Sequence, residues 1–202
     1  MATNAQRKAA TRAKIVNMAT QLYIRNGVKE TSIADIAKAA DISQVTLYKY
    51  FDSKQTLSSQ VVIQLIDEGY EQDAKIVEDP DRTFLEKMRL LMNQSTSMTA
   101  GMNPDFFDFV TAELAGKNGS TDAMAAYEAG KNHFWTELLQ QGREAGEISS
   151  EISNAAVMAY LDMFVSYFVS LSQSEAPAVQ ARMKSLGAEL DRLFFYGLIG
   201  KE

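Results

Sequence analysis

The spacing of apolar residues along this chain is helical almost throughout, and no segment shows the strict alternation expected of a pair of strands. In the first segment, apolar residues recur at the spacing of one helical face at Ile15, Met18, Ala19, Leu22 and Tyr23. This spacing predicts an amphipathic helix. The motif "RNG" predicts its end, because Gly27 suits the left-handed position that closes a helix. The pattern therefore predicts an all-α fold.

Two short helices are predicted directly after this segment. Ser32 and Asp35 have the spacing of a capping box at the start of "TSIADIAKAA", which would begin the first short helix. "DIS" then predicts a sharp turn, in which Asp41 can adopt the left-handed conformation. Ser43 can cap a second helix that runs from Gln44 to about Phe51. A short helix, a tight turn and a second short helix form a helix-turn-helix unit.

The second short helix offers an outward face that suits duplex DNA. Leu47 and Phe51 are four residues apart and are predicted to point into the core, which leaves the opposite side to solvent. That side carries Gln and Thr, which can hydrogen-bond base edges, and Val, which can contact a thymine methyl group. Its Tyr and Lys side chains can reach phosphates. These residues favour DNA binding, although a helical hairpin with a solvated face is the alternative.

Charge is divided unevenly along the 202 residues. Residues 1–54 contain nine Lys or Arg and four Asp or Glu, which gives +5, whereas the remainder carries −11 and the whole chain −6. Such an asymmetry suggests an anion-binding N-terminal part on an acidic body. A basic N-terminal tail without a ligand would show the same charge.

The stretch from about Arg12 to Leu57 resembles the tetracycline-repressor (TetR) family, also called TetR/AcrR, of bacterial helix-turn-helix transcription regulators. The family pattern is a first helix that closes at "NG", followed by "IA" and "A" in the second helix and then by "TLYxxFxxK". This chain matches the pattern at Thr31, Ser32, Ile36, Ala37, Ala40, Thr46, Leu47, Tyr48, Phe51 and Lys54. Two positions depart from it. Asp41 stands where Gly is usual, and Thr56 stands where a capping Glu is usual.

This resemblance implies a DNA-binding domain over residues 8–66, with its helix-turn-helix at 32–51, and a helical effector-binding and dimerisation domain over 67–202. It implies groove contacts from Ser43, Gln44, Val45, Thr46 and Lys49, and phosphate contacts from Thr31, Tyr48 and Lys54. For Tyr48 a place in the core remains an alternative, and for Tyr50 the core and the surface are almost equally favoured.

Aromatic and Met side chains in the second half suggest a greasy, adaptable cavity. Its candidate lining residues are Met88, Met92, Phe106, Phe109, Trp135, Phe164 and Tyr167. Aromatic stripes at helical spacing are also what an ordinary core contains, and residue by residue the core is the better interpretation. Asp105 and Asp108 share a helical face there and are interpreted as a solvated edge or as helix N-terminal charges.

The segment from Ala155 to Ser172 is the longest apolar run. A membrane span needs about 20 mostly apolar residues, and a polar stripe recurs at Asp162, Ser166 and Ser170, so a helix buried on two sides is predicted instead. One partner of this helix can be a second chain. The predicted homodimer interface consists of Val157, Leu161, Val165, Leu186 and Leu190, with burial inside one chain as the alternative.

The sequence offers little for catalysis. There is no cysteine, no Gly-rich phosphate loop and no GxSxG motif, and His133 is the single histidine, without a ligand at metal spacing. We therefore expect no enzyme, no cofactor and no metal, but a cytoplasmic protein that does not enter the membrane.

The predicted function is a dimeric repressor that binds a palindromic double-stranded DNA operator and is released by a small hydrophobic effector. A ligand-independent or activating regulator of the same fold is the nearest alternative. A helical interaction or enzyme domain with a purely structural helix-turn-helix is the alternative from another class.

Overall fold

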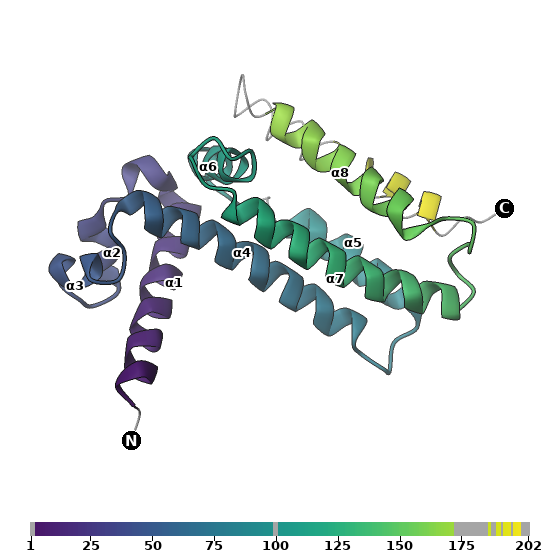
Figure 1. Ribbon diagram of the computed structural model, residues 1–202, viewed down its shortest axis with the longest axis horizontal. Coiled ribbons are helices and arrows are strands. Elements are labelled where there is room, and N and C mark those ends of the chain that lie inside the picture. The colour runs from purple at the N-terminus through teal and green to yellow at the C-terminus, as the bar shows by residue number, and fades with distance from the viewer. Residues whose placement is uncertain are drawn as a thin grey trace.

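The structure is a computed structural model that describes residues 3–98, 101–171, 186, 189–190, 192–194 and 196–198. Within these residues there are helices and no strand. The helices are α1 (Asn4–Glu30), α2 (Ile33–Ala39), α3 (Gln44–Tyr48), α4 (Lys54–Val77), α5 (Phe84–Met98), α6 (Pro104–Leu114), α7 (Asp122–Glu144) and α8 (Asn154–Leu171). Figure 1 shows α1 to α3 at one end of the molecule, which we call the head, and α5 to α8 with most of α4 at the other, which we call the body.

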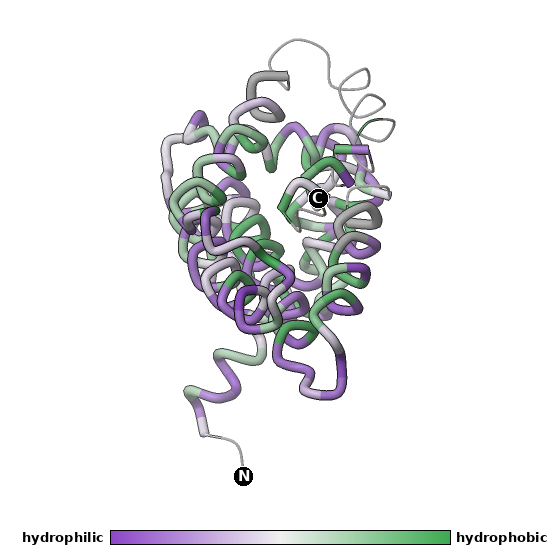
Figure 2. Tube along the Cα trace, turned by 90° about the vertical axis from the view of Figure 1, so that its right-hand side faces the viewer, coloured by the Kyte–Doolittle hydropathy of each residue, from purple (hydrophilic) through white to green (hydrophobic). Residues whose placement is uncertain are grey.

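The first helix is longer than its apolar stripe suggests. α1 begins at a capping box that Thr3 forms with Gln6, and its N-terminal end extends away from the other helices in two perpendicular views (Figures 1 and 2). Gly27 breaks the helical path with φ 83° and ψ 168°. A left-handed φ at Gly27 was predicted, and it is present, but helical hydrogen bonding resumes beyond it as far as Glu30.

The helix-turn-helix forms through the caps that its sequence predicts. Ser32 and Asp35 make a capping box at the start of α2, and Asp41 has φ 56° in the following turn. The Ser43 hydroxyl accepts a hydrogen bond of 3.1 Å from the Thr46 N–H at the start of α3. α3 ends at Tyr48 and not near Phe51, because the N–H of Lys49 turns to the nearer carbonyls of its own last turn.

One hydrophobic cluster joins the head to the body. Leu47 and Phe51 anchor α3 within it, and both are almost completely buried. Phe106 of α6 belongs to the same cluster, where its ring lies 5.6 Å from that of Tyr23. The Tyr23 hydroxyl accepts a 2.8 Å hydrogen bond from Ser58, and burial raises the pKa of Tyr23. The head therefore shares its core with α6. The predicted division of the chain into two domains at residue 66 remains a prediction.

α4 continues from the head into the body, where it runs beside α7 (Figure 1). The ring of Tyr70 on α4 lies directly against Gly130 of α7. A Cβ atom at Gly130 would lie 2.1 Å from Cδ2 of Tyr70, far inside van der Waals contact. The same ring packs 6.0 Å from Phe134 and 6.2 Å from Tyr127. The absent side chain at Gly130 thus sets how closely α4 and α7 approach.

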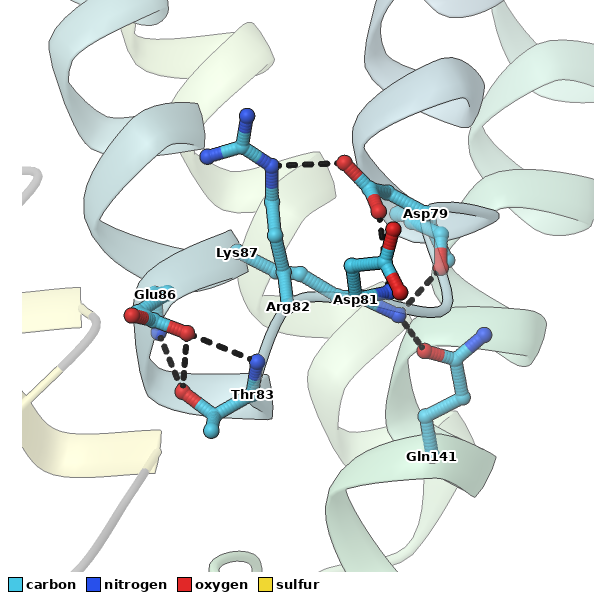
Figure 3. A network of polar contacts seen from close by, with 8 residues as sticks. Asp79, Asp81, Arg82, Thr83, Glu86, Lys87 and Gln141 are labelled. Atoms are coloured by element: carbon cyan, nitrogen blue, oxygen red, sulfur yellow. Dashed lines mark hydrogen bonds and ion pairs between the residues drawn. The ribbon is translucent and has the colours of Figure 1, made fainter.

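A buried lysine closes the turn between α4 and α5 (Figure 3). Lys87 Nζ donates to the carbonyl oxygen of Val77, at 2.6 Å, and to Oε1 of Gln141, at 2.9 Å. A positive charge at the C-terminal end of α4 is favourable, because the helix dipole is negative there. Arg82 pairs with Asp79 in the same turn. These bonds tie α4, α5 and α7 together at the end of the body that lies far from the head.

α8 packs against α7, where the side chain of Lys131, almost completely buried, pairs with Asp162 of α8 and Glu128 of α7. The Ser153 hydroxyl accepts from the Ala156 N–H at the start of α8. In the part of the chain that the structure describes, no helix combines the length and the apolar character needed to cross a membrane.

Candidate nucleic-acid interface

α3 presents one side to the core and the other to solvent. Leu47 has no exposed surface, whereas Val45 is 69% exposed and Tyr48 49% exposed. Gln44 and Lys49 are exposed as well. Val45 and Lys49 each lie two residues from Leu47, about half a turn round the helix, so the anchoring of Leu47 directs them outward. Gln44 and Tyr48 lie on the flanks between that side and the core. The arrangement is a rigid, polar and partly basic ridge on the outside of the head.

Two hydroxyl groups on this ridge are already engaged at its first turn. The hydroxyl oxygens of Ser43 and Thr46 lie 2.9 Å apart in a mutual hydrogen bond. The Thr46 oxygen can still accept a further bond, since it has two lone pairs, whereas the Ser43 oxygen also accepts from the Thr46 N–H. Gln44, Val45 and Lys49 are therefore the side chains most available to base edges, and Ser43 and Thr46 are better suited to the groove wall.

The two tyrosines that follow have different environments. Tyr48 is exposed, whereas Tyr50 is half-buried and packs against the cluster shared by head and body. The alternative that Tyr48 belongs to the core is therefore not supported, and Tyr50 is the core residue of the pair. A phosphate contact from Tyr48 stays a prediction.

The other two predicted phosphate contacts are less open. Lys54, in the first turn of α4, is half-buried, and its Nζ lies 3.5 Å from the carbonyl oxygen of Lys29, to which it donates. Thr31 is buried, with its hydroxyl donating to the carbonyl oxygen of Gly27 at 2.7 Å. A phosphate contact from the Thr31 hydroxyl would need this bond to break, so Thr31 is the least available member of the predicted set.

The residues predicted to line an effector pocket do not gather around one described cavity. Phe106 and Phe109 belong with the cluster shared by head and body, whereas Met88 and Trp135 lie in a second cluster inside the body. Phe164 is half-buried beside Tyr160, and Tyr167 is 40% exposed. The side chain of Met92 lies outside the described residues. That these residues line a pocket remains a prediction.

A cavity of about 300 Å³ lies elsewhere, between the first turns of α8 and residues 193–198. Its lining is mostly apolar and consists of Ile152, Ala156, Val157, Tyr160, Leu193, Phe194, Gly197 and Leu198. Sequence reasoning did not find this set, because the lining joins two segments that are about 40 residues apart and that share no motif.

α8 turns a different stripe outward from the one predicted to form the interface. Val157 is buried and Leu161 packs against the second cluster, while Val165, Leu186 and Leu190 are half-buried. The large apolar residues exposed in this region are Tyr160, Met163, Tyr167, Leu193 and Tyr196. Val157 serves its own chain in this structure, because the body core takes up that side of α8. A second chain would meet the stripe at Tyr160, Met163 and Tyr167.

In the described ranges, no group of three or more His, Cys, Asp or Glu side chains could hold a metal ion. The polar residues that sequence reasoning missed lie instead between α6 and the head. Asn103, Asp105 and Glu113 make hydrogen bonds to α1 and α4. For Asn103 and Asp105 the signal in the sequence is the polar and acidic segment "NPDFFDF", which fits an exposed helix start equally well, and Glu113 lies outside that segment.

Comparison of sequences connects this head to known regulators. The family described as bacterial regulatory proteins, tetR family, matches residues 15–61. The transcriptional repressor KstR2 of Rhodococcus jostii is 22% identical over 156 residues, which cover 76% of each chain. The transcriptional regulator UidR of Escherichia coli is 26% identical over 160 residues, 77% of this chain and 78% of that protein. These relatives are regulators of transcription and not enzymes.

Comparison of structures extends the likeness to the body. FadR of Thermus thermophilus, described as a TetR-family transcriptional repressor in complex with lauroyl-CoA, superposes with a TM-score of 0.61 at 24% identity. The match covers 95% of this chain and 96% of that one. Escherichia coli NemR in its reduced form superposes with a TM-score of 0.63 over 95% of this chain and 99% of NemR, at 14% identity. The prediction of an all-α fold, with a helix-turn-helix head and a helical C-terminal domain, is confirmed.

Proposed function

Because the chain belongs to the TetR family of bacterial transcription regulators, we propose that it is a repressor that binds a palindromic operator as a homodimer. It works in the cytoplasm, and a small hydrophobic effector releases it from DNA. The observation that carries this proposal is the outward side of α3. There an exposed Gln44, Val45 and Lys49 stand on a helix that the buried Leu47 holds in place.

These outward residues have separate roles in the proposal. Gln44 makes two hydrogen bonds to an adenine, and Val45 packs against a thymine methyl group in the major groove. Lys49 contacts base edges or the groove wall, and Lys54, together with Tyr48, reaches phosphates. Ser43 and Thr46 line the groove wall, where their mutual hydrogen bond holds both hydroxyls in place.

The dimer follows from the reach of one head and from the exposed surface of α8. A single short helix reads only a few base pairs, so two heads on half-sites about 34–36 Å apart are needed for specific recognition. The exposed stripe of Tyr160, Met163 and Tyr167 provides a self-complementary apolar face of the kind that a twofold interface uses. Leu193 and Tyr196 extend this face on the C-terminal segment.

The effector is proposed from the chemistry of the body. Its interior combines aliphatic side chains with aromatic and Met ones, among them Met88 and Trp135, and apolar interiors that contain aromatic and Met side chains can accommodate apolar molecules of irregular shape. The similar Thermus thermophilus FadR is described with lauroyl-CoA, whose acyl chain is apolar. An effector releases the repressor only if it binds the free and DNA-bound conformations with different affinity.

The test is selection of duplexes from a randomised library by the wild-type chain, followed by binding measurements on the selected duplex. We expect a palindromic sequence and an affinity that falls steeply with salt, because Lys and Arg displace counterions from the phosphates. Gln44→Ala should lose preference at one base pair of each half-site, at a cost of about 1–3 kcal/mol.

Gln140→Ala is the matched control, since Gln140 is exposed on α7 in the body. It should leave both affinity and preference unchanged. A wild-type chain that enriches no sequence would overturn the proposed function. Uniform weakening by Gln44→Ala on every duplex would make Gln44 a backbone contact.

A further inference from the structure

The start of α6 covers the point where α1 breaks. At Gly27 the backbone leaves the helical path, so groups on either side lose their helical partners. The Asn103 N–H donates to the carbonyl oxygen of Ile24 at 2.9 Å, and the Asn103 side-chain amide donates to that of Arg25 at 3.3 Å. Backbone groups left unpaired away from water destabilise a fold. Residues just ahead of α6 thus supply bonds that the break in α1 removes.

Asp105 bonds to the chain on the C-terminal side of the same break. Its Oδ2 accepts a 2.8 Å hydrogen bond from the backbone N–H of Lys29, and its Oδ1 lies 2.9 Å from Lys29 Nζ. The Lys29 side chain is 84% exposed, so its ion pair is weak in water. The backbone bond is the stronger constraint, because it fixes the chain and not a flexible side chain. Asp105 therefore holds the segment that leads directly into α2.

Gly27 allows this close approach. A Cβ atom at Gly27 would lie 2.8 Å from Oδ1 of Asn103 and 3.0 Å from Cβ of Asp105. Any side chain at residue 27 would therefore push α6 away from α1, in addition to the strain of φ 83°. The start of α6 therefore packs directly on the broken part of α1, and the position of α6 depends on the absence of a side chain at residue 27.

The far end of α6 contacts the head again, on the other side of the helix-turn-helix. Glu113 is buried, and its Oε1 accepts from Gln55 Nε2 at 3.1 Å and from Asn118 Nδ2 at 2.8 Å. Gln55 lies in the first turn of α4, directly after Lys54. A carboxylate is favourable near that helix N-terminus, where the backbone N–H groups carry partial positive charge. α6 is thus attached to the chain both before α2 and after α3.

We propose that Asp105 is a positioning residue for DNA reading: through the Lys29 backbone it holds α2 and α3 in the orientation that fits the groove, without touching DNA. The inference rests on the proposed function. Only the fraction of molecules with correctly oriented heads binds the operator, so loosening this contact lowers apparent affinity by reducing that fraction. Glu113 fixes the other end of α6 and thereby gives Asp105 a defined place relative to α4.

The electrostatics of the contact agree with a charged Asp105. Burial alone would raise the pKa of Asp105, but the hydrogen bonds and the charge of Lys29 outweigh burial and lower it below its usual value. The carboxylate therefore stays ionised at neutral pH and accepts both bonds from Lys29.

The experiment compares Asp105→Ala, Asp105→Asn and wild type on the duplex selected by the wild-type chain and on a scrambled duplex of equal length. Asp105→Ala leaves the Lys29 N–H without its partner and should weaken binding to the selected duplex by roughly three- to tenfold. Binding to the scrambled duplex should not change, since it needs charge and not orientation. Asp105→Asn should restore most of the affinity, because its amide oxygen can still accept from the Lys29 N–H.

Asp122→Ala and Asp122→Asn are the matched controls, since Asp122 is exposed at the start of α7 and its removal changes the net charge equally. Measurements are made where circular dichroism shows each variant to be folded. Equal affinity of Asp105→Ala and wild type for the selected duplex would overturn the inference, as would equal loss on both duplexes. Either result leaves the proposed function intact, whereas failure of the wild type to select a duplex removes the proposed function itself.

Discussion

α3 and α8 both expose side chains to solvent, yet the two surfaces differ in chemistry. α3 has five residues and surrounds the exposed Val45 with Gln44, Tyr48 and Lys49, all of which can hydrogen-bond. α8 has 18 residues and exposes Met163 between two tyrosines. The first surface suits a charged, hydrated partner, and the second suits an apolar one. The difference shows that exposure alone does not identify a binding surface, whereas the chemistry of the exposed groups indicates the class of partner.

The anchoring of the two surfaces also differs. α3 is too short to be stable alone and depends on Leu47, which contacts the cluster shared by head and body. α8 is long, and its inner side packs on the body through Val157 and Leu161. Substitution of one buried anchor residue should therefore disturb the α3 surface more than the α8 surface.

The largest expected effect comes from Leu47→Ala, which removes the anchor of α3. Since Leu47 is completely buried, the free energy of unfolding should fall by about 2–5 kcal/mol. Denaturant unfolding followed by circular dichroism measures this loss. Val45→Ala, on the exposed side of the same helix, should change stability by less than about 0.5 kcal/mol. Similar losses for the two variants would contradict the orientation of α3.

A charge on the α8 surface should separate the proposed dimer. Met163→Asp places a carboxylate in an apolar face, and central interface residues contribute about 2 kcal/mol or more, so dimer affinity should fall by roughly thirtyfold. Light scattering coupled to size-exclusion chromatography measures the mass. Ala125→Asp introduces the same charge at an exposed position of α7 and should leave the mass unchanged. A Met163→Asp variant that stays dimeric at all concentrations would refute this interface.

On the head, Lys54→Ala tests a single phosphate contact. The slope of log affinity against log salt should become shallower by about one, because one fewer counterion is released. Fluorescence anisotropy at several salt concentrations measures the slope. Lys75→Ala, an exposed lysine on the same helix within the body, should keep the wild-type slope. An unchanged slope for Lys54→Ala would remove Lys54 from the set of phosphate contacts.

The smallest effect concerns the acidic body. Burial raises the pKa of Asp73 to about 6. Because this value lies above the ordinary one, the stabilisation from neutral Asp73 is complete below about pH 4 and is lost as the pH rises through about 6. Asp73→Asn should therefore stabilise the protein at pH 7.5 by about 1 kcal/mol, after allowance for the partial exposure of the side chain.

At pH 4 the Asp73→Asn variant and the wild type should unfold at nearly the same denaturant concentration. Asp122→Asn serves as the control, since Asp122 is fully open to solvent at the start of α7. A stability difference between Asp73→Asn and wild type that does not vary with pH would contradict the raised pKa, because it would mean that the pKa of Asp73 is the same in the folded and unfolded states.

Much of the head could be predicted from local sequence. Ser32 and Ser43 cap the helices that they were predicted to cap, and Asp41 adopts its left-handed turn. These features depend on residues three or four positions apart, which a sequence displays directly. The end of α3 was placed near Phe51, three residues beyond its last helical residue Tyr48, because the apolar anchor Phe51 continues the helical spacing of Leu47.

The body was harder to predict because its contacts join distant segments. α8 carries two apolar stripes, and nothing in periodicity decides which of them faces the core. Asp105 was interpreted as a solvated charge or a helix N-terminal charge, and it does lie in the first turn of α6. Its contact with Lys29 was not predicted, since Lys29 is 76 residues earlier in the chain. The cavity beside Val157 likewise depends on residues 193–198. Such pairings are set by packing and leave no local pattern.

The crossing of α4 and α7 also bears on which changes natural variation can tolerate. At residue 130 even a methyl group would overlap the Tyr70 ring, whereas at Gly101 an added Cβ atom would meet nothing within 4 Å. Related chains that keep this crossing should therefore retain glycine at 130, or lose it only together with a smaller residue at 70. The residue at position 101 should vary freely among related chains. The two glycines should therefore differ in conservation, although the sequence alone does not distinguish them.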